Sequence, residues 1–265
     1  MRLEISDITA GYPGFTLTGL SLTVPAGSHT VLIGSNGCGK STLLKAISRQ
    51  LALQAGRITF DGVDIAGLSA KTLAQQTALL PQHPIVPPGI TVKQLVGYGR
   101  APYQNFLGLA SDHDRTTVAQ AIEAVDLTAR RDTPVTELSG GQRQRAFLAM
   151  CIAQDSPLML FDEPTSFLDI RHQYEVLELM AALQRDGKTV VTVLHDIALA
   201  ARYATNLVVM KDGAIYAHGT PADVVTAAMV QDVYGLTADI IADPNSGTPM
   251  LSARPMDALS PLSDG

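Results

Sequence analysis

Residues 34–41 read Gly-Ser-Asn-Gly-Cys-Gly-Lys-Ser and match the pattern G-x-x-x-x-G-K-[ST]. The glycines allow backbone N–H groups to turn inward and cradle phosphates, and a helix that follows adds the positive end of its dipole. We expect Lys40 to reach the β- and γ-phosphates of a nucleotide and the Ser41 hydroxyl to ligate Mg²⁺. The motif therefore predicts a nucleotide-binding loop between a buried strand and a helix.

The sequence on both sides of this loop has the periodicities that the motif requires. Before it, residues 31–33 are an apolar run that suits a buried strand, and residues 3–24 alternate with period two around a turn cluster at residues 11–14. After it, apolar residues follow helical spacing, at Leu43, Leu44, Ile47 and Leu51. We therefore expect short N-terminal strands and then a strand–loop–helix unit.

A second apolar strand, Leu158–Phe161, ends in two carboxylates. Asp162 can hold Mg²⁺, usually through water, and Glu163 can polarise a water molecule for in-line attack on a γ-phosphate. A solvated strand end would explain the pair equally well in isolation, but a phosphate-binding loop in the same chain favours the chemical interpretation. A helix at about 173–184 and an apolar strand at 190–194 follow, which predicts a β-α-β unit with a parallel sheet.

Residues 138–142 read Leu-Ser-Gly-Gly-Gln and precede an apolar-periodic helix. The Ser139 hydroxyl and the amides of Gly140 and Gly141 can form an anion site at the helix N-terminus. An ordinary N-cap at Ser139 explains the pattern at least as well when it is taken alone. Because the chain already has one phosphate site, we expect the second to serve a nucleotide held by another copy.

The remaining sequence indicates one large domain with a helical insertion. Residues 57–65 and 207–219 predict hairpins that turn at Asp61-Gly62 and Asp212-Gly213. Residues from about 87 to 154 predict a helical insertion that contains an amphipathic helix at 115–127. Residues after about 254 have the composition of a disordered tail.

Composition excludes several classes of protein. Hydrophobic residues make up 46% and charged residues 17%, as in a globular chain with a core. The net charge is -6, and about half of it lies in residues 237–265, so we expect no basic surface and no nucleic-acid partner. Cys38 and Cys151 have no metal-site spacing, which favours a reducing cytosol. Neither a signal peptide nor a run near the roughly 20 apolar residues of a membrane span is expected, so a membrane link requires a partner.

Taken together and in this order, the motifs resemble the ATP-binding-cassette (ABC) ATPase family from about Leu3 to Leu236. The resemblance implies an α/β fold, with a RecA-like P-loop NTPase core, an N-terminal antiparallel β-subdomain and an inserted α-helical subdomain. It divides the chain into a nucleotide-binding domain at 1–236, with the helical subdomain at about 87–154, and a partly disordered C-terminal extension at 237–265.

The resemblance also assigns roles to single residues. Tyr12, Gln82 and His195 would alone be taken as structural, but they match the family's adenine-stacking aromatic, Q-loop glutamine and switch histidine, and residues 166–169 match its D-loop. The implied catalytic residues are Glu163, His195, Lys40 and Gln82, and the implied Mg²⁺ ligands are Ser41, Gln82 and Asp162. The implied ATP-binding residues are Tyr12, Gly34, Ser35, Asn36, Gly37, Cys38, Gly39, Lys40, Ser41, Thr42, Ser139, Gly140, Gly141 and Gln142.

A narrower resemblance points to a subfamily. Residues 91–103, 163–173 and 195–203 are similar to the importer ATPases for iron–siderophore complexes and, less closely, to those for haem and cobalamin. This implies ATP hydrolysis that powers import of a ferric siderophore at the cytoplasmic face of the cell membrane. The implied partners are a second copy in a head-to-tail dimer, integral membrane permease subunits and, indirectly, a substrate-binding protein.

Two alternatives to this function remain open at this point. The first is an ABC importer ATPase for haem, cobalamin or another metal chelate. The second is a soluble ABC ATPase, which is less favoured because repair relatives carry long insertions and translation relatives carry two cassettes in one chain. The sequence also offers candidates for a groove that receives a permease helix, although the same residues could complete the helical core: Leu95, Val96, Tyr98, Tyr103 and Phe106.

Overall fold

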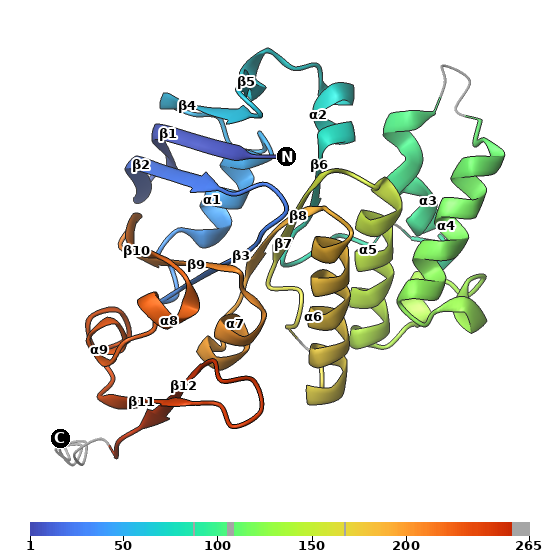
Figure 1. The fold of residues 1–265 in the computed structure, drawn as a ribbon. Helices are drawn as coiled ribbons and strands as arrows, with labels where there is room; N and C mark the ends of the chain where they lie inside the picture. Colours follow the sequence, from blue (N-terminus) through green and yellow to red (C-terminus); the bar gives the residue numbers. More distant parts are fainter. Residues whose placement is uncertain (87, 105–108, 167, 256–265) are drawn as a thin grey trace, which may run out of the picture.

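The computed structural model describes residues 1–86, 88–104, 109–166 and 168–255. The N-terminal sheet is antiparallel and lies at the upper left of Figure 1, with the strand order β2-β1-β4-β5. Its strands are β1 (Leu3–Tyr12), β2 (Phe15–Val24), β4 (Ala55–Phe60) and β5 (Val63–Asp64). The hairpin expected at residues 57–65 is confirmed, because β4 pairs with β5 across the Asp61-Gly62 turn.

The central sheet is parallel except at one edge. Its strand order is β10-β9-β3-β8-β7-β6, and only the β10–β9 pair is antiparallel among the described strands of this sheet. Its strands are β3 (His29–Gly34), β6 (Thr77–Leu80), β7 (Leu158–Asp162), β8 (Thr189–Val193), β9 (Asn206–Lys211) and β10 (Ala214–Gly219). The predicted β-α-β unit is confirmed, since β7 and β8 pair in parallel and α6 (Ile170–Arg185) joins them.

The continuous apolar runs of the parallel strands are explained by burial on both faces of the sheet. Along β3, Val31 and Ile33 belong to one hydrophobic cluster and Leu32 to the other. Along β7, Met159 and Phe161 face the first cluster, whereas Leu158 and Leu160 face the second. The second cluster joins the central sheet to the N-terminal sheet and α1 (Lys40–Ile47), and the first joins it to the helical region.

The helical region lies on the right of Figure 1 and corresponds to the expected insertion. It contains α3 (Val92–Gly97), a 3₁₀ segment (Tyr98–Tyr103), α4 (Asp112–Ala124) and α5 (Gly140–Gln154). The amphipathic helix expected at 115–127 begins earlier, because Ser111 is its N-cap. The Ser111 hydroxyl accepts from the Asp114 N–H, and the Asp114 carboxylate accepts from the Ser111 N–H. The short helix α2 (Ala70–Gln76) precedes β6 and has no counterpart in the sequence prediction.

The C-terminal part contains elements that the sequence did not reveal. These are α7 (Ile197–Tyr203), α8 (Pro221–Val224), α9 (Ala227–Tyr234) and a hairpin of β11 (Ala238–Ala242) and β12 (Pro249–Ala253). The hairpin lies at the lower left of Figure 1 and packs on α7 and α9. Residues 238–253 of the expected extension therefore contain this hairpin, and residues 256–265 of the expected tail lie outside the described residues.

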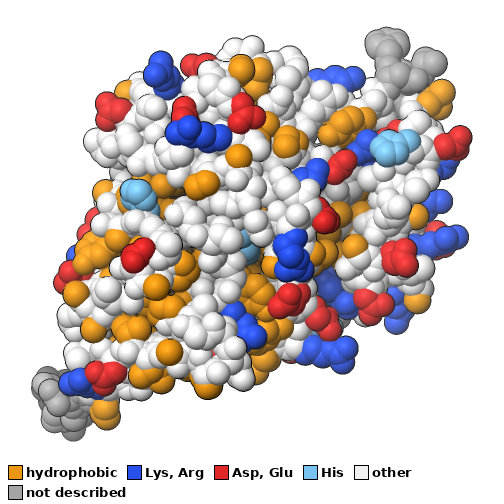
Figure 2. Space-filling model, in the orientation of Figure 1, with side chains coloured by type: hydrophobic (Ala, Val, Ile, Leu, Met, Phe, Trp, Pro, Cys, Tyr) orange, Lys and Arg blue, Asp and Glu red, His pale blue; other side chains and the backbone are white. Residues whose placement is uncertain are grey.

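The surface shown in Figure 2 carries basic and acidic side chains intermingled over the helical region, and hydrophobic side chains gather towards the C-terminal hairpin. Within the described parts of the chain, no helix has both the length and the apolar character needed to cross a membrane.

Candidate functional site

The parallel topology brings the predicted site residues together at the carboxyl ends of the strands of the central sheet. The strands β3, β6, β7 and β8 run in the same direction, so their carboxyl ends lie side by side. Gly34 ends β3, Asp162 ends β7, Gln82 follows β6 by two residues, and His195 follows β8 by two residues. This edge is the usual place for a ligand site in an open α/β sheet.

The loop between β3 and α1 is compact and rests on neighbouring strands. Gly34 has a φ of 146°, and a Cβ atom there would lie 2.2 Å from the carbonyl oxygen of Met210 and 2.8 Å from Cys38 Sγ. Only glycine fits both the backbone conformation and this close approach. Cys38 is a free cysteine and is buried.

The Lys40 side chain is held inside the loop. Its Nζ donates hydrogen bonds of 2.9 Å to the carbonyl oxygens of both Gly34 and Ser35. The side chain is buried, so its positive charge is concentrated where the loop amides and the α1 N-terminus already favour an anion. The loop is therefore prepared to bind a phosphate group.

A hydrogen bond between Ser41 and Asp162 connects α1 to the end of β7. The Ser41 hydroxyl donates to Asp162 Oδ1 at 3.0 Å. Burial raises the pKa of Asp162; the hydrogen bond from Ser41 opposes this rise and the nearby Glu163 carboxylate adds to it. A hydroxyl and a carboxylate are the hard oxygen donors that suit Mg²⁺ when substrate phosphates and water complete the coordination.

Within the described residues, no cluster of three or more His, Cys, Asp or Glu side chains could hold a metal by itself.

Glu163 and His195 form the chemical centre of the site. His195 Nε2 lies 2.6 Å from Glu163 Oε1, and Ser166 Oγ donates to Glu163 Oε2 at 3.1 Å. Burial would raise the pKa of Glu163, but hydrogen bonds from His195, Gln82 and Ser166 outweigh it and hold the pKa below its ordinary value. The carboxyl group is therefore ionised at neutral pH, as a proton acceptor must be.

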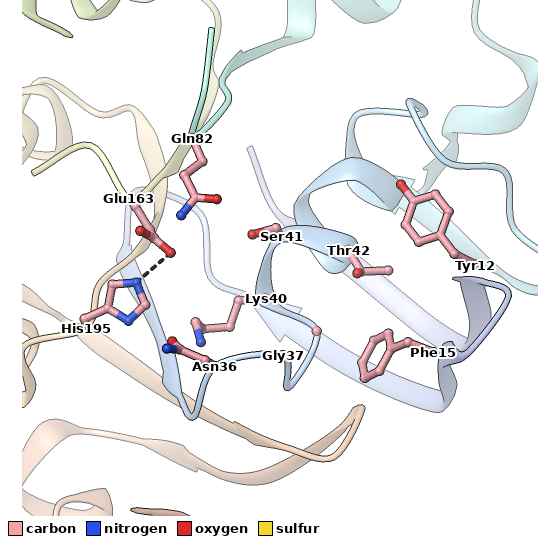
Figure 3. A pocket seen from close by; sticks show the side chains of 11 residues that line it. Tyr12, Phe15, Asn36, Gly37, Lys40, Ser41, Thr42, Gln82, Glu163 and His195 are labelled. Atoms are coloured by element: carbon pink, nitrogen blue, oxygen red, sulfur yellow. Dashed lines mark ion pairs between the residues drawn. The ribbon is translucent and has the colours of Figure 1, made fainter. Parts of the chain in front are cut away.

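The backbone at Glu163 is unusual. Its φ is 53°, in the left-handed region that a glutamate rarely adopts. Such conformations persist when the surrounding structure fixes them, and they cluster at functional sites. In Figure 3 the Glu163 carboxylate points to the His195 ring.

These groups surround a single open cavity of about 860 Å³, here called the P-loop cavity (Figure 3). Its lining includes ten of the predicted site residues: Tyr12, Asn36, Gly37, Gly39, Lys40, Ser41, Thr42, Gln82, Glu163 and His195. The predicted residues Gly34, Ser35, Cys38 and Asp162 lie behind this lining, connected to it by the contacts above. The volume is large enough for a nucleotide-sized ligand.

The sequence analysis missed Phe15, which also lines the P-loop cavity. Phe15 pairs directly with Tyr12 across the β1–β2 turn, so both aromatic rings lie on the same side of the hairpin. Tyr12 is exposed, and Lys45 Nζ lies 5.8 Å from the centre of its ring. The two-residue turn at residues 13–14 was the available signal, because it makes residues 12 and 15 direct neighbours.

The predicted residues Ser139–Gln142 are not part of the P-loop cavity. Ser139 caps α5, with its Oγ accepting from the Gln142 N–H at 3.3 Å while Gln142 Oε1 accepts from the Ser139 N–H at 3.1 Å. Ser139 and Gly140 are exposed. Within one chain this segment is a capped helix start that faces solvent.

The segment between Glu163 and α6 connects the chemical centre to that helix. Asp169 caps α6 by accepting from the His172 N–H at 2.9 Å. Ile170, the first residue of α6, is strongly exposed. Phe167, which belongs to the expected D-loop, lies outside the described residues.

The residues proposed to receive a permease helix separate into two groups. Leu95 and Val96 are fully buried in the helical core, so for them the interpretation as a groove was wrong. Tyr98 and Tyr103 are exposed, and Tyr98 lines a cavity of about 400 Å³ between α3 and α4, here called the α3–α4 cavity. Phe106 lies outside the described residues.

Comparison with known proteins places this geometry in context. A family model described as ABC transporter matches residues 17–166. The chain is 47% identical to a probable siderophore transport system ATP-binding protein, YusV, of Bacillus subtilis (strain 168), over 87% of this chain and 84% of the relative. It is 42% identical to the ferric enterobactin transport ATP-binding protein FepC of Escherichia coli (strain K12), over 94% and 93%.

More distant relatives extend the comparison. The hemin import ATP-binding protein HmuV of Rhodococcus jostii (strain RHA1) is 39% identical over 90% of this chain and 81% of its own. Among solved structures, a putative metal-chelate type ABC transporter in an inward-facing conformation superposes with a TM-score of 0.82 and 25% identity, covering 96% and 97% of the two chains. The ATP-binding cassette MJ0796, in a dimeric post-hydrolysis state with ADP and Pi, superposes with a TM-score of 0.73 and 26% identity, covering 82% and 98%.

Proposed function

The chain belongs to the ABC transporter family as an ATP-binding, ATP-hydrolysing subunit, and on this premise we propose that it powers the import of ferric siderophores across the cytoplasmic membrane. The main observation that supports ATP hydrolysis is the hydrogen-bonded pair of Glu163 and His195. This pair faces Lys40 and Ser41 across one cavity. An ionised carboxylate opposite a phosphate-binding loop is the arrangement that hydrolysis of a nucleotide γ-phosphate requires.

ATP is proposed to occupy the P-loop cavity. The amides of residues 34–42 and the Lys40 ammonium would bind its phosphates, and Tyr12, with Phe15 beside it, would stack on the adenine. Ser41, Asp162 and Gln82 would hold Mg²⁺, which would supply positive charge to the β- and γ-phosphates. Asp162 and Ser41 are already hydrogen-bonded to each other, so both oxygens are oriented towards one point.

Hydrolysis is proposed to depend on Glu163 as the group that accepts a proton from the attacking water. His195 holds the carboxylate in place through Oε1, and Ser166 holds it through Oε2. Gln82 also donates to the same carboxylate, and it lies in the chain between β6 and the helical region. Gln82 can therefore report the state of the γ-phosphate to that region.

Dimers of this cassette are proposed to be the active form. Ser139 and Gly140, at the start of α5, are exposed to solvent, and the segment Ser139–Gln142 lies away from the cavity of its own chain. In a head-to-tail dimer they would bind the phosphates held by the second copy, which gives the second anion site a use. We also propose that residues 1–236 form the nucleotide-binding domain, with the helical subdomain at about 87–154.

The membrane partner is proposed to be a permease that docks in the α3–α4 cavity. This cavity opens beside the exposed Tyr98, and its wall contains both apolar and charged groups. One helix of the permease would fill it, as in other helix-in-groove contacts. The chain would then sit at the cytoplasmic face of the membrane, with a substrate-binding protein on the other side.

The cargo is inferred from relatives, because the ATPase site has no contact with it. Relatives at 47% and 42% identity are named for siderophore and ferric enterobactin transport, whereas the relative named for hemin import is 39% identical. A ferric siderophore is therefore favoured over haem, cobalamin or another metal chelate.

Deletion of the gene tests this proposal. Under iron limitation, the deletion strain should fail to grow on a ferric catecholate or hydroxamate siderophore, and uptake of radiolabelled iron from it should fall to background. Growth in iron-replete medium should remain normal, and a plasmid copy of the wild-type gene should restore uptake. If siderophore uptake is unchanged while haem or cobalamin uptake fails, the ATPase assignment stands and the cargo assignment is wrong.

A further inference from the structure

The helical region contains a buried ion pair that the ATPase mechanism does not use. Arg100 and Asp114 are each about 95% buried, and Arg100 Nε donates to Asp114 Oδ1 at 2.8 Å. Arg100 Nη1 donates at 2.9 Å to the carbonyl oxygen of Ala153 in the last turn of α5. The other carboxylate oxygen, Asp114 Oδ2, accepts from the N–H and the hydroxyl of Ser111, at 2.9 and 2.7 Å.

A buried ion pair of this kind is weak evidence for a role in stability. Removing two charges from water is costly, and well-packed apolar side chains in their place are often neutral or stabilising. The pair instead fixes the relative positions of its partners, because a guanidinium is planar and holds its N–H donors in fixed directions. The ring of Tyr103 lies 3.9 Å from the guanidinium carbon and further restricts its orientation. Arg100 therefore fixes α4 and the end of α5 relative to the 3₁₀ segment.

The same 3₁₀ segment is pressed against α5. A Cβ atom at Gly99 would lie 2.3 Å from the carbonyl oxygen of Met150, so this residue approaches the helix more closely than any other residue type could. Helix α5 has 15 residues and is roughly 22 Å long at 1.5 Å per residue. The first turn of this helix follows Ser139. A movement of its last turn would therefore also move Ser139–Gln142, the segment proposed to face the second copy.

Further hydrogen bonds connect the last turn of α5 to the strand that leads to the P-loop cavity. Gln154, the last residue of α5, donates from Nε2 to the carbonyl oxygens of Ala74 and Thr77, at 2.6 and 3.0 Å. Thr77 begins β6, which leads directly to Gln82. Gln75, in α2, also donates to the carbonyl oxygen of Pro102 in the 3₁₀ segment, at 2.9 Å.

The ion pair is also part of the wall of the α3–α4 cavity, which Arg100 and Asp114 both line. In Figure 1 the three helices α3, α4 and α5 lie side by side, with α5 nearest the central sheet. A segment that enters the cavity therefore meets a side chain that is hydrogen-bonded to both α4 and α5.

We propose that Arg100 is a positioning residue that, through Asp114 and the Ala153 carbonyl, sets the orientation of α5 according to the occupancy of the α3–α4 cavity. This inference rests on the proposed function, in which a permease helix occupies that cavity. Arg100 touches neither nucleotide nor cargo. It links the permease contact to Ser139 at one end of α5 and, through Gln154, to Gln82.

The test uses the complex that co-purifies with the tagged ATPase from membranes of its own host, reconstituted into vesicles. Arg100→Lys keeps the charge, but a single ammonium cannot bond Asp114 and the Ala153 carbonyl with the same fork geometry. We expect ATP affinity within about twofold of wild type and the number of iron atoms imported per ATP hydrolysed to fall about tenfold. Glu123→Gln is the matched control, because Glu123 is exposed on the same helix and does not line the α3–α4 cavity.

The outcomes separate this inference from the function on which it rests. If the wild-type complex imports no ferric siderophore, the proposed function fails first. If the wild-type complex imports iron but Arg100→Lys keeps the wild-type ratio of import to hydrolysis, the inference is wrong. It is also wrong if hydrolysis and import fall in equal proportion together with the melting temperature. If Arg100→Lys does not assemble, Asp114→Asn, which keeps the volume and removes the charge, is measured against the same criteria.

Discussion

Glu163→Gln is expected to bind ATP with nearly wild-type affinity and to hydrolyse it about a thousandfold more slowly. Glutamine has almost the same shape, so the phosphate-binding loop and the Ser41–Asp162 contact remain intact. It cannot accept a proton, however, and the ionised carboxylate that His195, Gln82 and Ser166 stabilise is lost. Phosphate release at saturating ATP, together with nucleotide binding by equilibrium dialysis, measures both quantities.

The same variant should accumulate as an ATP-bound dimer, since the step that separates the two copies would be blocked. Size-exclusion chromatography with and without ATP would show this shift. Glu123→Gln, at an exposed position on α4, is the matched control and should hydrolyse ATP normally. Near-normal hydrolysis by Glu163→Gln would remove Glu163 from the role proposed here.

Ser139→Arg is expected to lower ATP turnover by more than about a hundredfold, although it lies outside the P-loop cavity of its own chain. The arginine would obstruct the helix start that is proposed to bind the phosphates of the second copy. Lys40→Ala is expected to lose activity to a similar extent, because it removes the buried ammonium from the loop. In the proposed dimer, each ATP site combines the phosphate-binding loop of one copy with Ser139–Gln142 of the other. The two substitutions therefore affect different parts of this composite site.

Mixing the two inactive proteins should therefore restore activity. In a mixed dimer, the intact phosphate-binding loop of the Ser139→Arg chain meets the intact Ser139–Gln142 segment of the Lys40→Ala chain, and the other site carries both substitutions. With free exchange and independent sites, an equimolar mixture should reach about a quarter of wild-type turnover. Thr136→Arg, at an exposed position just before Ser139, controls for the added charge. Normal hydrolysis by Ser139→Arg alone would contradict the composite site.

The nucleotide-binding half of the fold was predictable because its signals are local. A glycine loop between an apolar strand and a helical pattern fixes residues 29–47, and parallel pairing then brings Glu163 and His195 to the same edge as Lys40. The C-terminal hairpin was not predictable in the same way. Its turn depends on Asp243, which accepts from the N–H groups of Asn245 and Ser246, and its strands are short.

Other features could not be decided from one sequence. Leu95, Val96 and Tyr98 are all apolar or aromatic, but helix geometry buries the first two and exposes the third. Ser139 is a good helix cap in a single chain and a phosphate-binding residue only if a second copy is present. The Arg100–Asp114 pair was invisible because its partners come from three separate elements.

The central claim, that ATP hydrolysis by this chain drives ferric siderophore import, is tested most directly by uptake into sealed vesicles. The complex co-purified with the tagged chain is reconstituted with Mg²⁺-ATP enclosed, and a siderophore loaded with radiolabelled iron is supplied outside with its binding protein. Iron should accumulate inside the vesicles, and accumulation should stop when a non-hydrolysable ATP analogue replaces ATP or when the complex carries Glu163→Gln. Iron accumulation at the wild-type rate with the analogue, or with Glu163→Gln, would contradict it.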